Sequence, residues 1–324
     1  MSKQVPVTIL TGYLGAGKTT FLNRLLKEQH GHKIAVIENE FGEEGIDNDI
    51  LEQQEGEQII EMNNGCICCN VRGDLVRILG ELKDKRKAGA LHFERVIIET
   101  TGLAAPSPVA QTFFMEDSVA DYYRLDAILT VVDAKHANFQ LDNHPEAQEQ
   151  VGFADRILLS KTDMVSEAEQ AELRGRLSRI NARAPIQAVN FGSAAIDDVL
   201  DINGFNVNAI LEVEPTFFAE NHHHHDDEVG SFVFKSSRPF NPQKLDEFMD
   251  TLVQVYGESM LRYKGLLYIK GTPRRVLLQG VHKMVATDLG KPWTKAEKPS
   301  SKIVFIGKKL PKDIFLKGLE SCLV

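Results

Sequence analysis

The chain is short of cysteine, of positive charge and of long apolar runs. Its 324 residues contain four cysteines, and 46 acidic side chains outnumber 37 basic ones, for a net charge of −9. Four cysteines are too few for a disulfide framework in a chain of this size, so we expect reduced thiols. No run of about 18 apolar residues is present, which argues against a membrane span. The acidic balance argues against a general attraction to nucleic acid or anionic lipid.

Composition and the amino terminus predict a cytoplasmic globular protein. The first residues, MSKQVPVTIL, lead toward glycines without the cleavage region of a signal peptide. A hydrophobic content of 43% is enough for ordinary buried cores, and the length predicts about two domains. We therefore expect a cytoplasmic protein without nucleic-acid or membrane partners, while a homodimer stays open.

Short apolar runs alternate with amphipathic stretches in the first 192 residues. This pattern is typical of βα units around a mostly parallel sheet whose strands are buried on both faces. The predicted strands are residues 5–10, 33–38, 95–99, 127–133, 156–160 and 185–189. The helix after the first strand is predicted to bury Phe21, Leu22, Leu25 and Leu26. We expect a doubly wound α/β domain over residues 1–192.

A polar and acidic stretch, residues 193–229, follows and indicates a linker that contains the run from His222 to His225. Residues 230–324 predict a smaller carboxy-terminal α+β domain with an antiparallel sheet. One of its helices should begin at Asn241 and Pro242, and another after Pro311. Its predicted strands are residues 231–235, 265–270, 275–281, 284–287 and 302–306.

A phosphate-binding loop is predicted between the first strand and the first helix. The segment from Gly12 to Thr19, GYLGAGKT, fits the pattern GxxxxGK[ST]. Its glycines allow backbone N–H groups to point at phosphates near the positive end of a helix. Lys18 would reach the β- and γ-phosphates, and the Thr19 hydroxyl would hold Mg²⁺.

Two further strand ends complete a predicted nucleotide site. Glu99 ends one strand and is followed by Gly102, the layout expected of an acidic residue beside Mg²⁺ and a glycine that senses the γ-phosphate. Lys161 and Asp163 follow another strand. A carboxylate here accepts from both N1–H and the exocyclic amine of guanine, whereas adenine presents a lone pair at N1, so GTP is favoured. The stem of Lys161 would lie along the base.

Three of the four cysteines lie in one glycine-led turn, Cys66, Cys68 and Cys69. At least two of these thiols can reach one ion, and thiolates prefer Zn²⁺ or Cu(I). Glu38, at the end of a predicted strand, and the nearby Glu43 are the carboxylates that could complete a tetrahedral site. Buried structural thiols and a redox disulfide are the alternatives, although both possible disulfide closures are strained. The histidine run could bind a metal or simply be a polar linker.

The motifs GYLGAGKTT, IENEFGEEGID, NGCICC, ETTG and SKTD together resemble those of the CobW-like family of P-loop GTPases, which are related to nickel-inserting GTPases of urease and hydrogenase maturation. The segments LRYKG at residues 261–265 and QGVH at residues 279–282 resemble the family's carboxy-terminal domain. The resemblance covers nearly the whole chain. It implies GTP hydrolysis coupled to handling a metal, most often zinc, for delivery to a client metalloprotein.

The resemblance also implies residue roles. Residues for the nucleotide would be Gly12, Gly15, Ala16, Gly17, Lys18, Thr19, Thr20, Gly102, Lys161 and Asp163. Mg²⁺ would lie near Thr19, Glu99 and the switch-loop acid Asp47, and the metal ligands would be Glu38, Cys68 and Cys69, with Cys66 close by. One departure is Ser160, where GTPases usually have asparagine, and the shorter hydroxyl is expected to lose a bond to the base or the loop.

These residues suggest a hypothesis in which GTP and Mg²⁺ order residues 39–50, next to Glu38, so that hydrolysis triggers metal release. Intrinsic turnover should be slow, because no water-positioning glutamine or arginine finger is evident, and no catalytic base is assigned. Three alternative functions remain open. The protein could be a small-molecule kinase or ATPase with structural zinc, a metal buffer or sensor with little turnover, or an insertion factor for cobalt, nickel or iron.

Overall fold

The computed structural model describes residues 4–27, 33–38, 58–61, 71–190, 199–202, 228–294 and 297–324. The chain divides into two compact units, one made of Met1–Arg174 with Ala184–Gly204 and the other of Gly175–Arg183 with Phe205–Val324. Residues 199–202, within the stretch predicted to be a linker, belong to the first unit, where Val199 and Leu200 are buried in its core. No helix among the described residues is long and apolar enough to cross a membrane.

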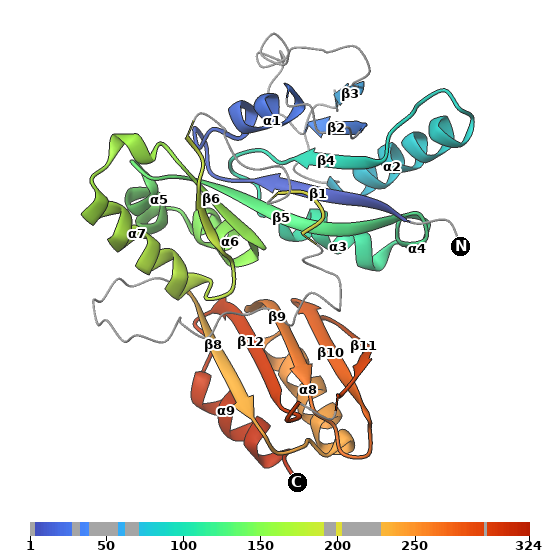
Figure 1. Cartoon of the computed structure of the whole chain (residues 1–324), viewed down its shortest axis with the longest axis vertical. Coiled ribbons are helices and arrows are strands. Elements are labelled where there is room, and N and C mark those ends of the chain that lie inside the picture. Colours follow the sequence, from blue (N-terminus) through green and yellow to red (C-terminus); the bar gives the residue numbers. More distant parts are fainter. Residues whose placement is uncertain are drawn as a thin grey trace. The chain divides into compact units, whose positions relative to one another are not determined.

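The first unit is built on a parallel sheet of seven described strands, in the order β3-β2-β4-β1-β5-β6-β7 (Figure 1). The strands are β1 Val5–Thr11, β2 Ile34–Glu38, β3 Gln58–Glu61, β4 Arg95–Glu99, β5 Tyr123–Asp133, β6 Arg156–Ser160 and β7 Ile186–Ala188. The helical segments are α1 Lys18–Lys27, α2 Val71–Lys87, α3 Ser107–Met115, α4 Asp117–Ala120, α5 Ala137–Asn143, α6 Pro145–Phe153, η1 Thr162–Met164 and α7 Glu167–Ile180, which continues from Gly175 onward into the second unit. The predicted doubly wound fold is confirmed.

Core packing explains why the apolar runs are nearly continuous. Successive residues of β1, Ile9 and Leu10, are both buried, so both faces of the sheet are covered. On one face α1 inserts Phe21, Leu22, Leu25 and Leu26 against β1, β2, β4, β5 and β6, as the sequence predicted. The chain runs to one side of β1 through β2, β3 and β4, and to the other side through β5, β6 and β7. Ligands of open α/β sheets bind at such a switch point, beside the carboxyl ends of the strands.

Strands β1, β2 and β7 agree with their predictions to within one residue at each end, whereas β3 and β5 differ more. Strand β3 was missed, because its two isoleucines form a very short apolar run. Strand β5 begins at Tyr123, four residues before its predicted start at residue 127. Arg124 and Asp126 interrupt the apolar pattern there, but their side chains form an ion pair with N···O 3.6 Å, and Asp126 is fully buried. Strands β4 and β6 have the predicted bounds.

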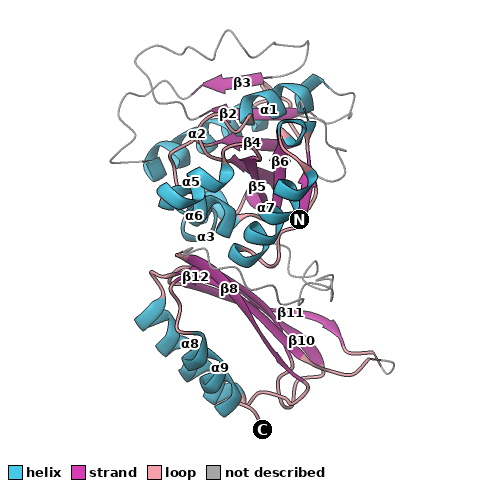
Figure 2. Cartoon of the chain, turned by 90° about the vertical axis from the view of Figure 1, so that its left-hand side faces the viewer, coloured by secondary structure: helices cyan, strands magenta, loops and turns pink. Residues whose placement is uncertain are grey.

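The second unit contains a five-stranded antiparallel sheet in the order β11-β10-β9-β12-β8. Its elements are β8 Val229–Ser236, α8 Pro242–Tyr256, β9 Met260–Leu267, β10 Arg274–Val281, β11 Met284–Pro292, β12 Ser301–Lys308 and α9 Lys312–Ser321. Both helices lie on one side of this sheet (Figure 2). They bury Leu245, Met249, Phe315 and Leu319 against it in one core, which also contains the thiol of Cys322. The predicted antiparallel α+β domain is confirmed.

The prediction for β9 was wrong by five residues at its start. The strand runs through Arg262 and Lys264, which are 2% and 4% exposed, and ends at Leu267, whereas the apolar run pointed to residues 265–270. The predicted strand began only after these two basic residues. Burial of the cations inside a central strand cannot be seen from hydropathy alone.

The amino-terminal cap of α8 was predicted correctly and allows a stability test. The Asn241 side chain accepts a hydrogen bond from the Lys244 backbone N–H, at 3.1 Å, and Pro242 begins the helix. Replacing Asn241 with Ala should lower the free energy of unfolding of the second unit by about 1 kcal/mol. Trp293 is the only tryptophan of the chain, so its fluorescence in a denaturant titration follows this unit. Gln243→Ala, at an exposed first-turn position, is the control and should change it little.

Candidate functional site

The loop between β1 and α1 has the backbone shape that phosphate binding requires. Gly12, Gly15 and Gly17 have φ angles of 146°, 72° and 97°, which residues with a Cβ rarely adopt. A Cβ at Gly12 would lie 2.3 Å from the Val131 carbonyl oxygen of β5, so the first turn also needs glycine for space. Lys18 is 9% exposed, and its Nζ donates to the Gly12 carbonyl at 3.0 Å. The loop and its lysine therefore have the backbone geometry expected of a phosphate-binding loop at the start of α1.

The end of β4 lies directly beside this loop. Glu99 pairs in register with Leu10 of β1, and the Thr19 hydroxyl donates to Glu99 Oε1 at 3.2 Å. A Cβ on Gly102 would lie 2.6 Å from the Leu14 backbone nitrogen, so Gly102 touches the phosphate loop. Thr19, Glu99 and Gly102, which the sequence assigned to Mg²⁺ and the γ-phosphate, are brought together. A hydroxyl and a carboxylate are suitable oxygen ligands for Mg²⁺.

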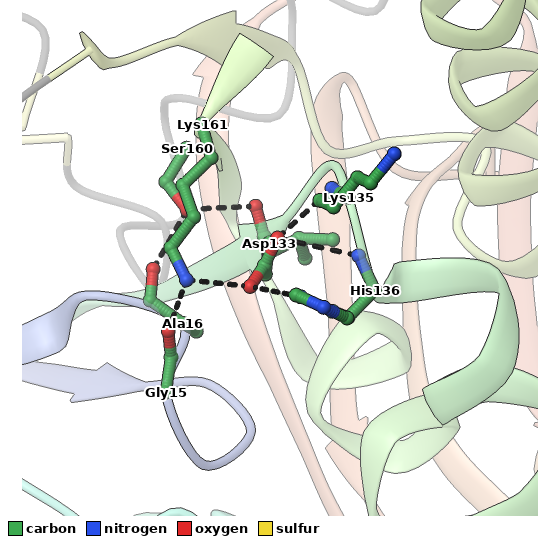
Figure 3. A network of polar contacts seen from close by, with 8 residues as sticks. Gly15, Ala16, Asp133, Lys135, His136, Ser160 and Lys161 are labelled. Carbon is green, nitrogen blue, oxygen red and sulfur yellow. Dashed lines mark hydrogen bonds and ion pairs between the residues drawn. The ribbon is translucent and has the colours of Figure 1, made fainter. Parts of the chain in front are cut away.

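The end of β6 contacts the same loop from the other side (Figure 3). The Ser160 hydroxyl donates to the Ala16 carbonyl at 2.7 Å, and Lys161 Nζ donates to the Gly15 carbonyl at 2.8 Å. The serine was expected to lose a bond to the base or the loop, and the structure shows that its short side chain does reach a loop carbonyl directly, while the loss of a bond to the base stays a prediction. Lys161 has a left-handed backbone, with φ 55°, which turns the chain sharply after the strand.

Asp133, at the end of β5, completes this network and was not predicted as a site residue. Its carboxylate is 2% exposed and accepts hydrogen bonds from Lys161 Nζ at 2.7 Å, His136 Nδ1 at 2.9 Å and the Lys135 backbone N–H at 2.9 Å. Burial alone would raise the pKa of this carboxyl, but the bonds from Lys161 and His136 outweigh it and leave the pKa below its ordinary value. Its place at the end of a predicted strand was the signal that could have identified it.

Asp163 lies in η1, two residues after Lys161, and its side chain is exposed. The turn that carries it is fixed by Thr162, whose N–H and hydroxyl both donate to the Asn190 side-chain oxygen, at 3.2 and 2.7 Å. Gln170 of α7 donates to the Thr162 carbonyl at 2.9 Å. No hydrogen bond or ion pair among the described residues occupies the Asp163 carboxylate, which leaves it available to a ligand.

The predicted metal site lies mostly outside the described residues. Cys66, Cys68, Cys69, Glu43 and Asp47 all fall there, as does the run from His222 to His225. The backbone of Glu38 is described, and it ends β2 in register with Glu99 of β4 on one side and Glu61 of β3 on the other. Within the described ranges, no group of three or more His, Cys, Asp or Glu side chains could hold a metal ion.

The buried carboxylate of Asp133 allows a test of the network. Because its folded-state pKa lies below the ordinary value of 3.8, its charge stabilises the fold above that pH, and the contribution is lost as the pH falls through the lowered pKa. Asp133→Asn should cost about 1 to 3 kcal/mol at pH 7, and the difference from the wild type should shrink below pH 4. Thermal unfolding followed by circular dichroism at several pH values measures this. His136→Ala, which removes a partner on an exposed ring, should cost less.

Comparison with known proteins places both units in one family. Residues 6–188 match the family described as "CobW/HypB/UreG, nucleotide-binding domain", and residues 229–323 match "Cobalamin synthesis protein cobW C-terminal domain". The chain is 43% identical over 312 residues to "Zinc chaperone YjiA" of Escherichia coli (strain K12), with 95% of this chain and 96% of that protein covered. It is 32% identical over 354 residues to "Zinc chaperone CobW" of Pseudomonas aeruginosa, with 99% and 92% covered.

The chain is also similar to a protein of Dictyostelium discoideum and to a solved crystal structure. The chain is 33% identical over 316 residues to "Zinc-regulated GTPase metalloprotein activator 1" of Dictyostelium discoideum, covering 85% of this chain and 65% of that protein. The crystal structure of the Zn(II)-bound YjiA GTPase from E. coli matches with a TM-score of 0.82 and 37% identity, over 99% of this chain and all of the other. The matches to both domains, at this identity and coverage, show that the chain belongs to the CobW family of the CobW/HypB/UreG nucleotide-binding proteins.

Proposed function

We propose that this protein is a GTPase that binds zinc through Cys66, Cys68 and Cys69 and couples GTP hydrolysis to delivery of the metal to a client metalloprotein. Relatives named zinc chaperones and a zinc-regulated GTPase metalloprotein activator support this proposal. The related crystal structure of a GTPase with bound Zn(II) supports both halves of it. Reduced thiols suit a cytoplasmic location, which we propose as well.

The described residues support specific roles in nucleotide binding. Backbone N–H groups of residues 12–20 would hold the phosphates, and Lys18 would leave the Gly12 carbonyl to reach them. Thr19 and Glu99, already in contact, would hold Mg²⁺ together with Asp47, and Gly102 would face the γ-phosphate. Bound Mg²⁺ would neutralise the negative charge that develops on the phosphates during hydrolysis. Lys161 would pack along the base, and Asp163 would accept its N1–H and amine protons.

One observation carries the coupling between metal and nucleotide. Glu38, the proposed zinc ligand, and Glu99, the proposed Mg²⁺ residue, occupy paired positions at the carboxyl ends of the neighbouring strands β2 and β4. Neighbouring strands lie about 4.8 Å apart, so the two sites share one edge of one sheet. A difference in zinc affinity between the GTP and GDP states must appear equally as a difference in nucleotide affinity between the zinc-bound and zinc-free states. Hydrolysis can then change how tightly zinc is held.

Chelator competition tests this proposal directly. Zinc affinity measured with a GTP analogue, with GDP and without nucleotide should differ by about fivefold or more between the GTP and GDP states. Three equal affinities would contradict the coupling. Absence of phosphate release above background, even with zinc and a client present, would indicate a metal buffer or sensor.

Paired cysteine variants separate the metal site from the nucleotide site. Replacing Cys68 and Cys69 with Ser should abolish tight zinc binding and leave GTP affinity nearly unchanged, because serine hydroxyls are poor zinc ligands. Cys322→Ala is the control, since that thiol is buried in the second unit and bonds to backbone carbonyls of Lys244 and Gly318. Loss of zinc and GTP binding together would mean that the thiols are structural.

The preference for one nucleotide base over another gives a separate test of the proposed role of Asp163 in guanine recognition. Asp163→Asn places N–H donors opposite the donors of guanine, so affinity for GTP should fall by about tenfold to a hundredfold. Xanthosine triphosphate, which has a carbonyl in place of the exocyclic amine, should bind the variant better than it binds the wild type. Competition against a fluorescent guanine nucleotide measures both. Glu167→Gln, an exposed carboxylate at the start of α7, should change neither affinity, and unchanged GTP binding by Asp163→Asn would refute the assignment.

A further inference from the structure

A buried glutamine of α6 is bonded to the loop that follows β4. Gln150 is 1% exposed, and its side-chain amide nitrogen donates to two carbonyl oxygens of that loop, those of Gly102 and Ala104, each at 3.1 Å. The backbone of Gln150 is fixed in turn, because the Thr130 hydroxyl of β5 donates to its carbonyl at 2.8 Å. The amide therefore connects the sheet and α6 to a loop 46 to 48 residues earlier in the chain.

Among the described residues, the other hydrogen bonds of this loop lie mainly at its start and within its own turn. Its start is fixed by Thr100, whose N–H donates to the Leu10 carbonyl at 2.9 Å and whose hydroxyl donates to Thr11 at 2.9 Å. The next segment turns, with the Ala104 N–H donating to the Thr101 carbonyl at 3.1 Å. Gly102 lies against the Leu14 backbone of the phosphate loop. The Gly102 carbonyl accepts a hydrogen bond from the Gln150 side-chain amide. Gln150 thus holds the carbonyl of a residue that touches the phosphate loop.

A second buried glutamine of the same helix bonds to a different element. Gln148 is 5% exposed, and its amide donates to the Leu141 carbonyl of α5 at 2.8 Å. Both glutamines are buried and donate to backbone carbonyls, but the described bonds of Gln150 go to the loop that carries Gly102, whereas the described bond of Gln148 goes to α5. The two side chains therefore form a matched pair for experiment.

We propose that Gln150 is a positioning residue for γ-phosphate recognition: it fixes the Gly102 backbone so that the loop after β4 distinguishes GTP from GDP. The inference rests on the proposed role of Gly102 as the residue that faces the γ-phosphate. GDP lacks that phosphate and makes its contacts through the phosphate loop and the base residues. Loss of the Gln150 amide should therefore weaken GTP binding selectively, while a general loss of fold would weaken both nucleotides.

Gln150→Met tests this proposal, because methionine has nearly the same volume as glutamine but no N–H donor. In the full-length protein with Mg²⁺, affinity for a non-hydrolysable GTP analogue should fall about tenfold, while GDP affinity should change less than about twofold. Titration against a fluorescent guanine nucleotide measures both, and circular dichroism reports folding. Gln148→Met is the matched control and should leave the ratio of GTP to GDP affinity at the wild-type value.

Gln150→Glu provides a second variant of nearly identical shape. A carboxylate would place an acceptor against the two carbonyl oxygens, so the selective loss of GTP-analogue affinity should be at least as large as in Gln150→Met. An unchanged ratio in a folded Gln150 variant, or equal weakening of both nucleotides, would overturn this inference while leaving the proposed GTPase intact. A wild-type protein that bound no guanine nucleotide would overturn both.

Discussion

The phosphate loop is the constraint on which the rest of the first unit depends. A loop that turns its N–H groups inward toward phosphates must find partners for its carbonyl groups elsewhere. Here the carbonyls of Gly12, Gly15 and Ala16 accept from Lys18, Lys161 and Ser160. Those of Tyr13 and Gly17 accept backbone N–H groups of Ala16 and Phe21. Part of the loop's shape is thus set by side chains from β6, far away in sequence.

Much of the fold could be predicted from the sequence because apolar runs mark strands buried on both faces. Strands β4 and β6 and the buried face of α1 agree with the prediction residue by residue. Apart from β3, whose apolar run is very short, the two misplaced strand starts have a common cause in charged residues that lie inside strands. Arg124 and Asp126 interrupt the apolar pattern at the start of β5, and Arg262 and Lys264 interrupt it in the first part of β9, so these parts were not predicted as strand. Pairing and burial of these charges depend on neighbours that hydropathy cannot show.

The site was predictable to the extent that it is local in sequence. The phosphate loop and the pairing of Thr19 with Glu99 follow from short motifs next to strand ends. Asp133 and Gln150 carry no motif, and their roles appear only through contacts with residues 28 and 48 positions away. The cysteine turn and its zinc remain a prediction, since those residues lie outside the described part of the chain.

The ion pair between Asp133 and Lys161 also bears on how the sheet assembles. Asp133 of β5 lies directly opposite Ser160 of β6, and Lys161 follows at once. A slip of one residue between these strands would move every side chain of β6 to the opposite face. It would also leave a buried carboxylate without its cation, which costs several kcal/mol. The lysine predicted to pack against the base therefore also favours the observed register of β5 and β6 over a shifted one.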